Sequence, residues 1–126
     1  MEVKVQRIYE ATETQGYRIL VDRLWPRGIS KEKARLDAWE KEIAPSDSLR
    51  QWFSHDVERY DEFRRRYQAE LDANPKVNAF LTLVRNALSS HDVILLFAAK
   101  DPLHNNAAVL REYLASHLQP IPANLQ

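Results

Sequence analysis

The run of apolar residues from Val93 to Ala99 constrains the fold of this chain more than any other feature. It is far too short to cross a lipid bilayer, and it has the length of a buried strand. A second segment, Tyr17 to Trp25, contains the consecutive apolar residues Ile19 to Val21. Because successive side chains of a strand point to opposite faces, such runs indicate a sheet that is covered on both faces.

The elements expected around these two strands follow the order strands, helices, strand, helix. A further strand is expected at Val3–Tyr9, and helical segments are expected at Ser30–Lys33, Ser46–Phe53, Asp56–Leu71, Pro75–Ser89 and Asn105–Leu118. The stretch from Leu36 to Ile43 fits a helix or a strand, and we favour a strand because Pro45 and Ser46 end it and start a helix. This order predicts an α/β fold, a single-domain sandwich with a small, mostly parallel sheet flanked by helices.

The length of 126 residues is that of one domain, which we expect to cover residues 1–118. Residues 119–126 contain two prolines and no periodicity, and an irregular C-terminal tail is expected there. The first residues contain no apolar run of the kind found in signal peptides. A cytoplasmic protein with no membrane partner is therefore expected.

The charges balance, with 18 Lys and Arg against 18 Asp and Glu, so no overall basic field is present and nucleic acid is not expected as a partner. The absence of cysteine excludes a disulfide framework, a zinc site with thiolate ligands and a cysteine nucleophile. The four histidines share no spacing typical of metal ligands, so no metal site is expected. Neither the dinucleotide-binding nor the P-loop glycine motif occurs, which leaves any cofactor unknown.

Charged residues gather where the strand expected at Tyr17–Trp25 ends. Asp22 and Arg23 are placed inside an otherwise apolar strand, where a charge is costly unless it is paired. Arg23, Arg27 and Lys31 are candidate ligands for an anion, and Gly28 permits a turn that exposes backbone N–H groups. The alternative is an internal ion pair between Asp22 and Arg23 that only holds the loop.

A second group follows the strand at Val93–Ala98. Lys100 and the start of the following helix, with Asn105 and Asn106, are candidate anion ligands, because a helix N-terminus carries a partial positive charge. His104 is a candidate general acid or base, as are Asp101 and Asp22. The plainer alternatives are that Asn105 only caps the helix, that Asp101 only accepts hydrogen bonds from loop amides, and that His104 is an exposed loop residue.

Two other charged stretches carry less weight. His55 and Asp56 form a possible acid–base pair, but Asp56 is better explained as the cap of the following helix. The basic run Arg64 to Arg66 is interleaved with acidic residues, which is typical of a solvated face with ion pairs.

Three stretches together resemble one group of bacterial proteins: Tyr17 to Ser46, which contains VDRLWPRG, Leu49 to Asp56, and Leu95 to Leu110, which contains AKD and HNNA. The chain is identified as a member of the YeaO-like proteins, a branch of the bacterial domain of unknown function numbered 488. The resemblance implies a small cytoplasmic α/β protein with no settled activity. Longer relatives carry a cysteine-containing phrase where this chain has Ala99 to Asp101, so thiol chemistry does not carry over.

The cations at the two strand ends predict a small anionic ligand, phosphate-like or nucleotide-like. Either an enzyme acts on this ligand, with Arg23, Arg27 and Lys100 holding it while His104 or Asp101 moves a proton, or a non-catalytic module senses it. A third reading is a protein-interaction module whose loops are only salt-bridged. All functional expectations require that residues 23–31 and 100–106 rim one cavity. The oligomeric state stays open.

Overall fold

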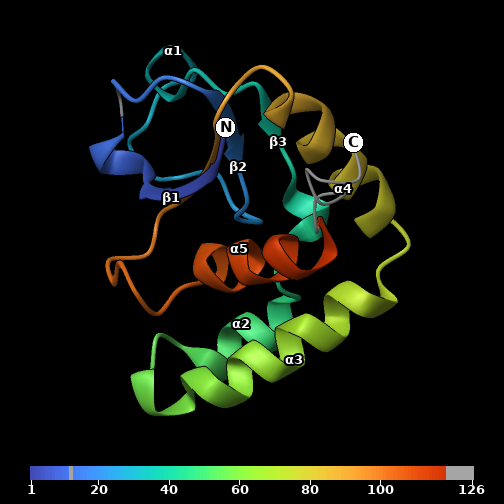
Figure 1. The fold of residues 1–126 in the computed structure, drawn as a ribbon. Helices are drawn as coiled ribbons and strands as arrows, with labels where there is room; N and C mark the ends of the chain where they lie inside the picture. The colour runs from blue at the N-terminus through green and yellow to red at the C-terminus, as the bar shows by residue number, and fades with distance from the viewer. Residues whose placement is uncertain (12, 119–126) are drawn as a thin grey trace.

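In the computed structural model, which describes residues 1–11 and 13–118, parallel strands form one four-stranded sheet (Figure 1). The strands are β1 (Val3–Arg7), β2 (Tyr17–Leu20), β3 (Ala38–Trp39) and β4 (Val93–Phe97). Their order across the sheet is β1-β4-β2-β3, and every neighbouring pair is parallel. The prediction of an α/β fold with a small, mostly parallel sheet is confirmed. The tail expected at residues 119–126 lies outside the described residues.

Side chains of β4 alternate between two cores, as its uninterrupted apolar run predicted. Every residue of β4 is buried. One core receives Val93, Leu95 and Phe97, and the other receives Ile94 and Leu96. Ile19 and Leu20 of β2 divide between the cores in the same way. The sheet is therefore covered on both faces, which is what a central parallel strand requires.

The first core lies under the longer helices, which are α2 (Asp47–Phe53), α3 (Tyr60–Ala73), α4 (Val77–Leu88) and α5 (Asn106–His117). α3 packs against both α2 and α5, and Figure 1 shows the three helices gathered on one side of the sheet. The second core is closed by short elements, η1 (Ile8–Glu10) and α1 (Lys31–Ala34). Two further 3-10 turns, η2 (Lys41–Ile43) and η3 (Val57–Arg59), precede α2 and α3.

Polar side chains cap these helices largely where the sequence predicted. Ser30, Ser46 and Asn105 each accept a hydrogen bond from a backbone N–H in the first turn of the helix that follows. Asp56 caps η3 in the same way. The helix expected from Pro75 begins later, at Val77, because the side chain of Asn74 accepts the N–H of Lys76 and holds a turn there.

The strand expected to run from Tyr17 to Trp25 ends at Leu20, so Asp22 and Arg23 do not lie inside a strand. The ladder stops because the N–H of Ala98, directly after β4, bonds to the Asp22 carboxylate instead of a backbone carbonyl. The segment from Leu36 to Ile43 is part strand and part 3-10 turn, β3 and η2. The first strand also ends early, at Arg7.

Because all strands are parallel, their carboxyl ends lie at one edge of the sheet, which we call the carboxyl edge. Two segments leave this edge from the central strands. The β2 loop, residues 21–30, connects β2 to α1, and the β4 loop, residues 98–105, connects β4 to α5. Ligands of open α/β proteins bind at such edges, so the candidate site is sought where the two loops meet.

Candidate functional site

Asp22 joins the β2 loop to the β4 loop. Its Oδ2 accepts a hydrogen bond from the Ala98 N–H at 2.8 Å, and its Oδ1 accepts one from Asn106 Nδ2 at 3.0 Å. The same Asn106 nitrogen donates to the Val21 carbonyl at 3.0 Å. One carboxylate thus holds together the ends of β2 and β4 and the first turn of α5. Segments far apart in the sequence meet here.

Burial raises the pKa of Asp22 above its usual value, and the hydrogen bonds from Ala98 and Asn106 oppose this shift. Electrostatic interaction with His55 and Arg50 also lowers the pKa of Asp22. The sequence analysis did not connect either residue with Asp22. Both come from α2 or the residues just after it, so a third segment of the chain contributes to this region.

Arg23 points toward the start of α2. Its guanidinium donates to the carbonyls of Ala44 at 3.1 Å and Pro45 at 3.3 Å, and Nε lies 3.9 Å from the Asp47 carboxylate. Asp22 and Arg23 form no ion pair with each other among the described contacts, so that explanation of the loop fails. Arg23 instead holds the segment between η2 and α2.

Arg27 is exposed at a turn of the β2 loop. Gly28 has a φ of 80°, which favours glycine, and the Ile29 N–H closes the turn on the Pro26 carbonyl at 3.4 Å. The Arg27 carbonyl accepts from the Tyr9 hydroxyl at 2.7 Å. Within residues 1–11 and 13–118, no hydrogen bond or ion pair was found for the Arg27 guanidinium.

Lys31 is exposed at the first position of α1. The carbonyl of Ala34, at the end of α1, accepts from Arg18 at 3.1 Å, and Arg18 is near the amino end of β2. α1 therefore leads the chain away from the carboxyl edge. No described side-chain contact joins Lys31 to the β4 loop.

Asp101 organises the β4 loop. Its Oδ1 accepts from the N–H groups of Leu103 and His104, at 2.9 and 3.1 Å, and its Oδ2 lies 2.9 Å from His104 Nδ1. These contacts, led by the Leu103 N–H, lower the pKa of Asp101. Asp101 thus accepts hydrogen bonds from loop amides, which was one of the two roles considered from the sequence. It also orients the His104 ring. Lys100 beside it is exposed.

The second ring nitrogen of His104, Nε2, takes no part in the bond to Asp101. The ring packs edge-on against Tyr60, with centroids 5.0 Å apart, and the Tyr60 hydroxyl donates to the Asn105 carbonyl at 3.2 Å. Asn105 is buried, and it bonds to Ala108 N and to the Asp101 carbonyl. Its side chain is therefore used in capping, and a ligand would have to displace those bonds.

Arg7 is a residue that the sequence analysis missed. It ends β1, and its Nε donates to the carbonyls of Ala98 and Ala99, at 3.2 and 3.1 Å. It also stacks on the Tyr9 ring. The available signal was a basic residue near the end of the first expected strand, Val3–Tyr9.

Two cavities of the molecule lie outside the space between the two loops. One, of about 360 Å³, is lined by residues that include Arg23, Ser46, Tyr67 and Glu70. The other, of about 580 Å³, lies between the start of β1 and the end of α5. Arg27, Lys100 and His104 line neither, so a cavity shared by both loops stays a prediction.

The described part of the chain has neither a helix able to span a membrane nor a cluster of metal ligands. None of its helices has the length and apolar character needed to cross a bilayer. None of its histidines and carboxylates gather in threes at a geometry that could hold a metal ion.

Comparisons with known proteins place the chain in a family. The family described as "Inactive DUF488-N3 subclade" matches residues 2–123. The uncharacterized protein YeaO of Escherichia coli K12 is 42% identical over 117 residues, which cover 92% of this chain and 99% of YeaO. Uncharacterized proteins of Mycobacterium bovis and Mycobacterium tuberculosis H37Rv are each 41% identical over 113 residues, covering 89% of this chain and 92% of theirs. No solved structure matches significantly. The chain therefore belongs to the YeaO-like branch of the DUF488 family.

Proposed function

We propose that this protein binds a small anionic ligand, phosphate-like or nucleotide-like, at the carboxyl edge between the β2 loop and the β4 loop. The observation that carries the proposal is the Asp22 junction, which brings Arg27 and Lys100 onto neighbouring loops. A guanidinium and an ammonium group that face solvent from adjacent loops are typical ligands of phosphate and carboxylate.

The arginines of α3 differ from the cations of the two loops in their charge pairing. Arginines of α3 are paired with carboxylates: Arg65 and Arg66 share Glu62, and Arg64 lies 3.5 Å from Glu112. Arg27 and Lys100 have no such partner among the described residues. An anionic ligand would supply the missing negative charge without displacing an existing ion pair.

Binding without catalysis is the reading we favour, since the matching family is described as inactive. The protein would then act as a sensor of an anionic metabolite. One observation favours the enzyme instead. Asp101 holds His104 by Nδ1 at 2.9 Å, an arrangement that leaves Nε2 to exchange a proton with a ligand. Turnover that disappears in His104→Gln with binding unchanged would support the enzyme.

A thermal-shift titration tests the binding proposal. Inorganic phosphate, pyrophosphate and AMP would be added to the wild type and to Arg27→Ala, Lys100→Ala and the control Arg85→Ala. Arg85 is exposed near the end of α4, which leads to the amino end of β4. A ligand at ten times its Kd stabilises by about 1.4 kcal/mol, or roughly 4–8 °C in Tm for a chain of this size. We expect this shift in the wild type and control and its loss in Arg27→Ala and Lys100→Ala; no shift with any anion would refute the proposal.

A further inference from the structure

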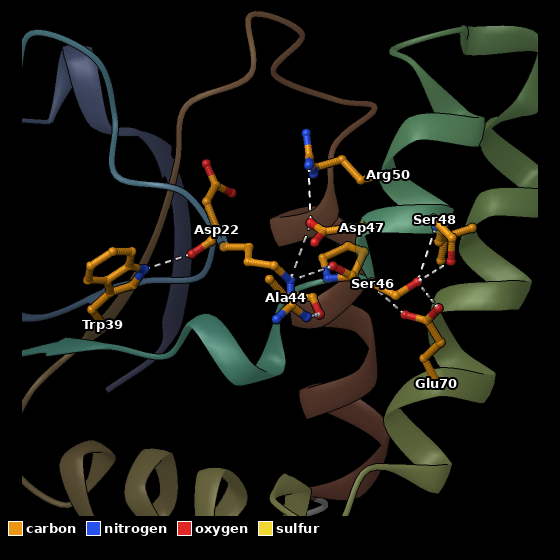
Figure 2. Close-up of polar contacts among 11 residues, drawn as sticks. Asp22, Trp39, Ala44, Ser46, Asp47, Ser48, Arg50 and Glu70 are labelled. Carbon is orange, nitrogen blue, oxygen red and sulfur yellow. Dashed lines mark hydrogen bonds and ion pairs between the residues drawn. The ribbon is translucent and has the colours of Figure 1, made fainter.

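Two guanidinium groups, those of Arg23 and Arg50, lie at the start of α2. The Asp47 carboxylate lies 3.1 Å from Arg50 Nη2 and 3.9 Å from Arg23 Nε, so two guanidinium groups share one carboxylate. Figure 2 shows Arg50 reaching over Asp47 on the same side of the chain as the Asp22 carboxylate. The Asp22 carboxylate and Glu70, which accepts two hydrogen bonds from Ser46, supply the other negative charges of this group.

The ion pair between Arg50 and Asp47 is exposed and weak. The two side chains are 44% and 63% exposed, and exposed pairs contribute about 0–1 kcal/mol. Only one N–H of Arg50 is used in a described hydrogen bond, while a guanidinium has five. Arg50 can therefore bind an anion at little cost in stability.

His55 is held in an unusual backbone conformation at the end of α2. Ser54 and His55 have φ values of 47° and 58°, in the left-handed region that residues other than glycine seldom adopt. Neither residue is a glycine, so the surrounding structure must hold this strained turn. Backbone strain of this kind clusters at functional sites. The turn places the His55 ring beside Phe53, with centroids 6.2 Å apart.

A chain of ring contacts links His55 to the β4 loop. Phe53 contacts Tyr60 at 5.9 Å, and Tyr60 contacts His104 at 5.0 Å. The end of α2 therefore lies beside the β4 loop, and electrostatic interaction with Arg50 and His55 lowers the pKa of Asp22.

Asp22 retains acceptor capacity. Each of its oxygens accepts one described hydrogen bond, whereas a carboxylate offers about four acceptor positions. Its side chain is only partly buried. A ligand that bound here with an anionic group alone would be repelled by Asp22, but a ligand that also carried a hydroxyl donor would gain a hydrogen bond.

We propose, building on the binding function above, that Arg50 and His55 extend the anion site and that Asp22 accepts a hydroxyl of the same ligand. The ligand class is a phosphate monoester that carries a free hydroxyl group. Arg50 binds the phosphate, His55 borders it, and Asp22 discriminates hydroxylated esters from plain ones.

Two probes and three variants test this inference by isothermal titration calorimetry. The probes are glycerol 3-phosphate, which has hydroxyl groups, and methyl phosphate, which has none. The variants are Arg50→Ala, His55→Ala and the control Arg85→Ala. We expect the wild type to bind glycerol 3-phosphate about 5–10 times more tightly than methyl phosphate, which corresponds to one added hydrogen bond. We expect Arg50→Ala to weaken both probes about tenfold, His55→Ala to weaken both less, and Arg85→Ala to change neither.

The outcomes separate this inference from the binding proposal on which it rests. If both probes bind, Arg27→Ala weakens them and Arg50→Ala does not, the inference is overturned and the binding function stands. If the wild type binds both probes equally, the role of Asp22 is overturned, and this comparison needs no variant that must fold. If neither probe binds, both proposals are overturned for phosphate esters.

Discussion

Removing the Asp22 carboxylate should destabilise the protein substantially, because this group fastens three elements. Asp22→Ala removes hydrogen bonds from Ala98 N and Asn106 Nδ2 at 2.8 and 3.0 Å. Hydrogen bonds to a charged group contribute about 1.5–3 kcal/mol each, but the desolvation of the carboxylate, which raises its pKa, offsets part of this. We expect a net loss of about 2–3 kcal/mol in the free energy of unfolding, or roughly 6–15 °C in Tm.

The assay is urea denaturation of wild type, Asp22→Ala, Asn106→Ala and the double variant. Because Asp22 and Asn106 bond directly, the two losses should be non-additive by about 1–2 kcal/mol. Asp61→Ala, at an exposed position of α3, is the control and should change stability by less than about 0.5 kcal/mol. A loss below about 0.5 kcal/mol for Asp22→Ala, or strict additivity, would refute the reasoning.

Two further predictions concern Asp22, Asp101 and Tyr67. The pKa of Asp22 is raised in the folded protein, so the contribution of Asp22 to stability should fall as pH rises from about 4 through the folded pKa. The pKa of Asp101 is lowered, so the contribution of Asp101 should be lost as pH falls below about 4. Urea denaturation from pH 3 to 7 should therefore show that the stability difference between wild type and Asp22→Asn changes with pH in the opposite direction to the difference between wild type and Asp101→Asn. A change in the same direction for both variants would contradict the two pKa directions. Tyr67→Phe removes a buried hydroxyl that donates to the Ile43 carbonyl at 2.6 Å and should lower the unfolding free energy by about 1–2 kcal/mol, measured in the same way; an unchanged value would mean that this bond is not formed.

Much of the architecture could be predicted because it follows from local patterns. The apolar runs in β2 and β4 predicted strands buried on both faces, and Ser46 and Asn105 marked the helices that they cap. The end of β2 could not be predicted, since it depends on a hydrogen bond between Asp22 and Ala98, which are 76 residues apart. An apolar pattern extending to Trp25 gives no sign of that bond.

The candidate site divides in the same way. Parallel strands bring their carboxyl ends to one edge, so the meeting of the β2 and β4 loops was predictable without coordinates. The roles of Arg50 and His55 were not, because they depend on how α2 packs against the sheet. The left-handed turn at Ser54 and His55 lacks glycine or asparagine, the residues that usually mark such a turn in a sequence.

The most direct test of the anion site is an NMR titration of the ¹⁵N-labelled protein with glycerol 3-phosphate, following every backbone amide. The account predicts saturable shifts concentrated in residues 22–30, 50–55 and 98–106, with Asp22, Arg27 and Lys100 among them. Shifts confined to other parts of the chain, or none at millimolar ligand, would contradict it.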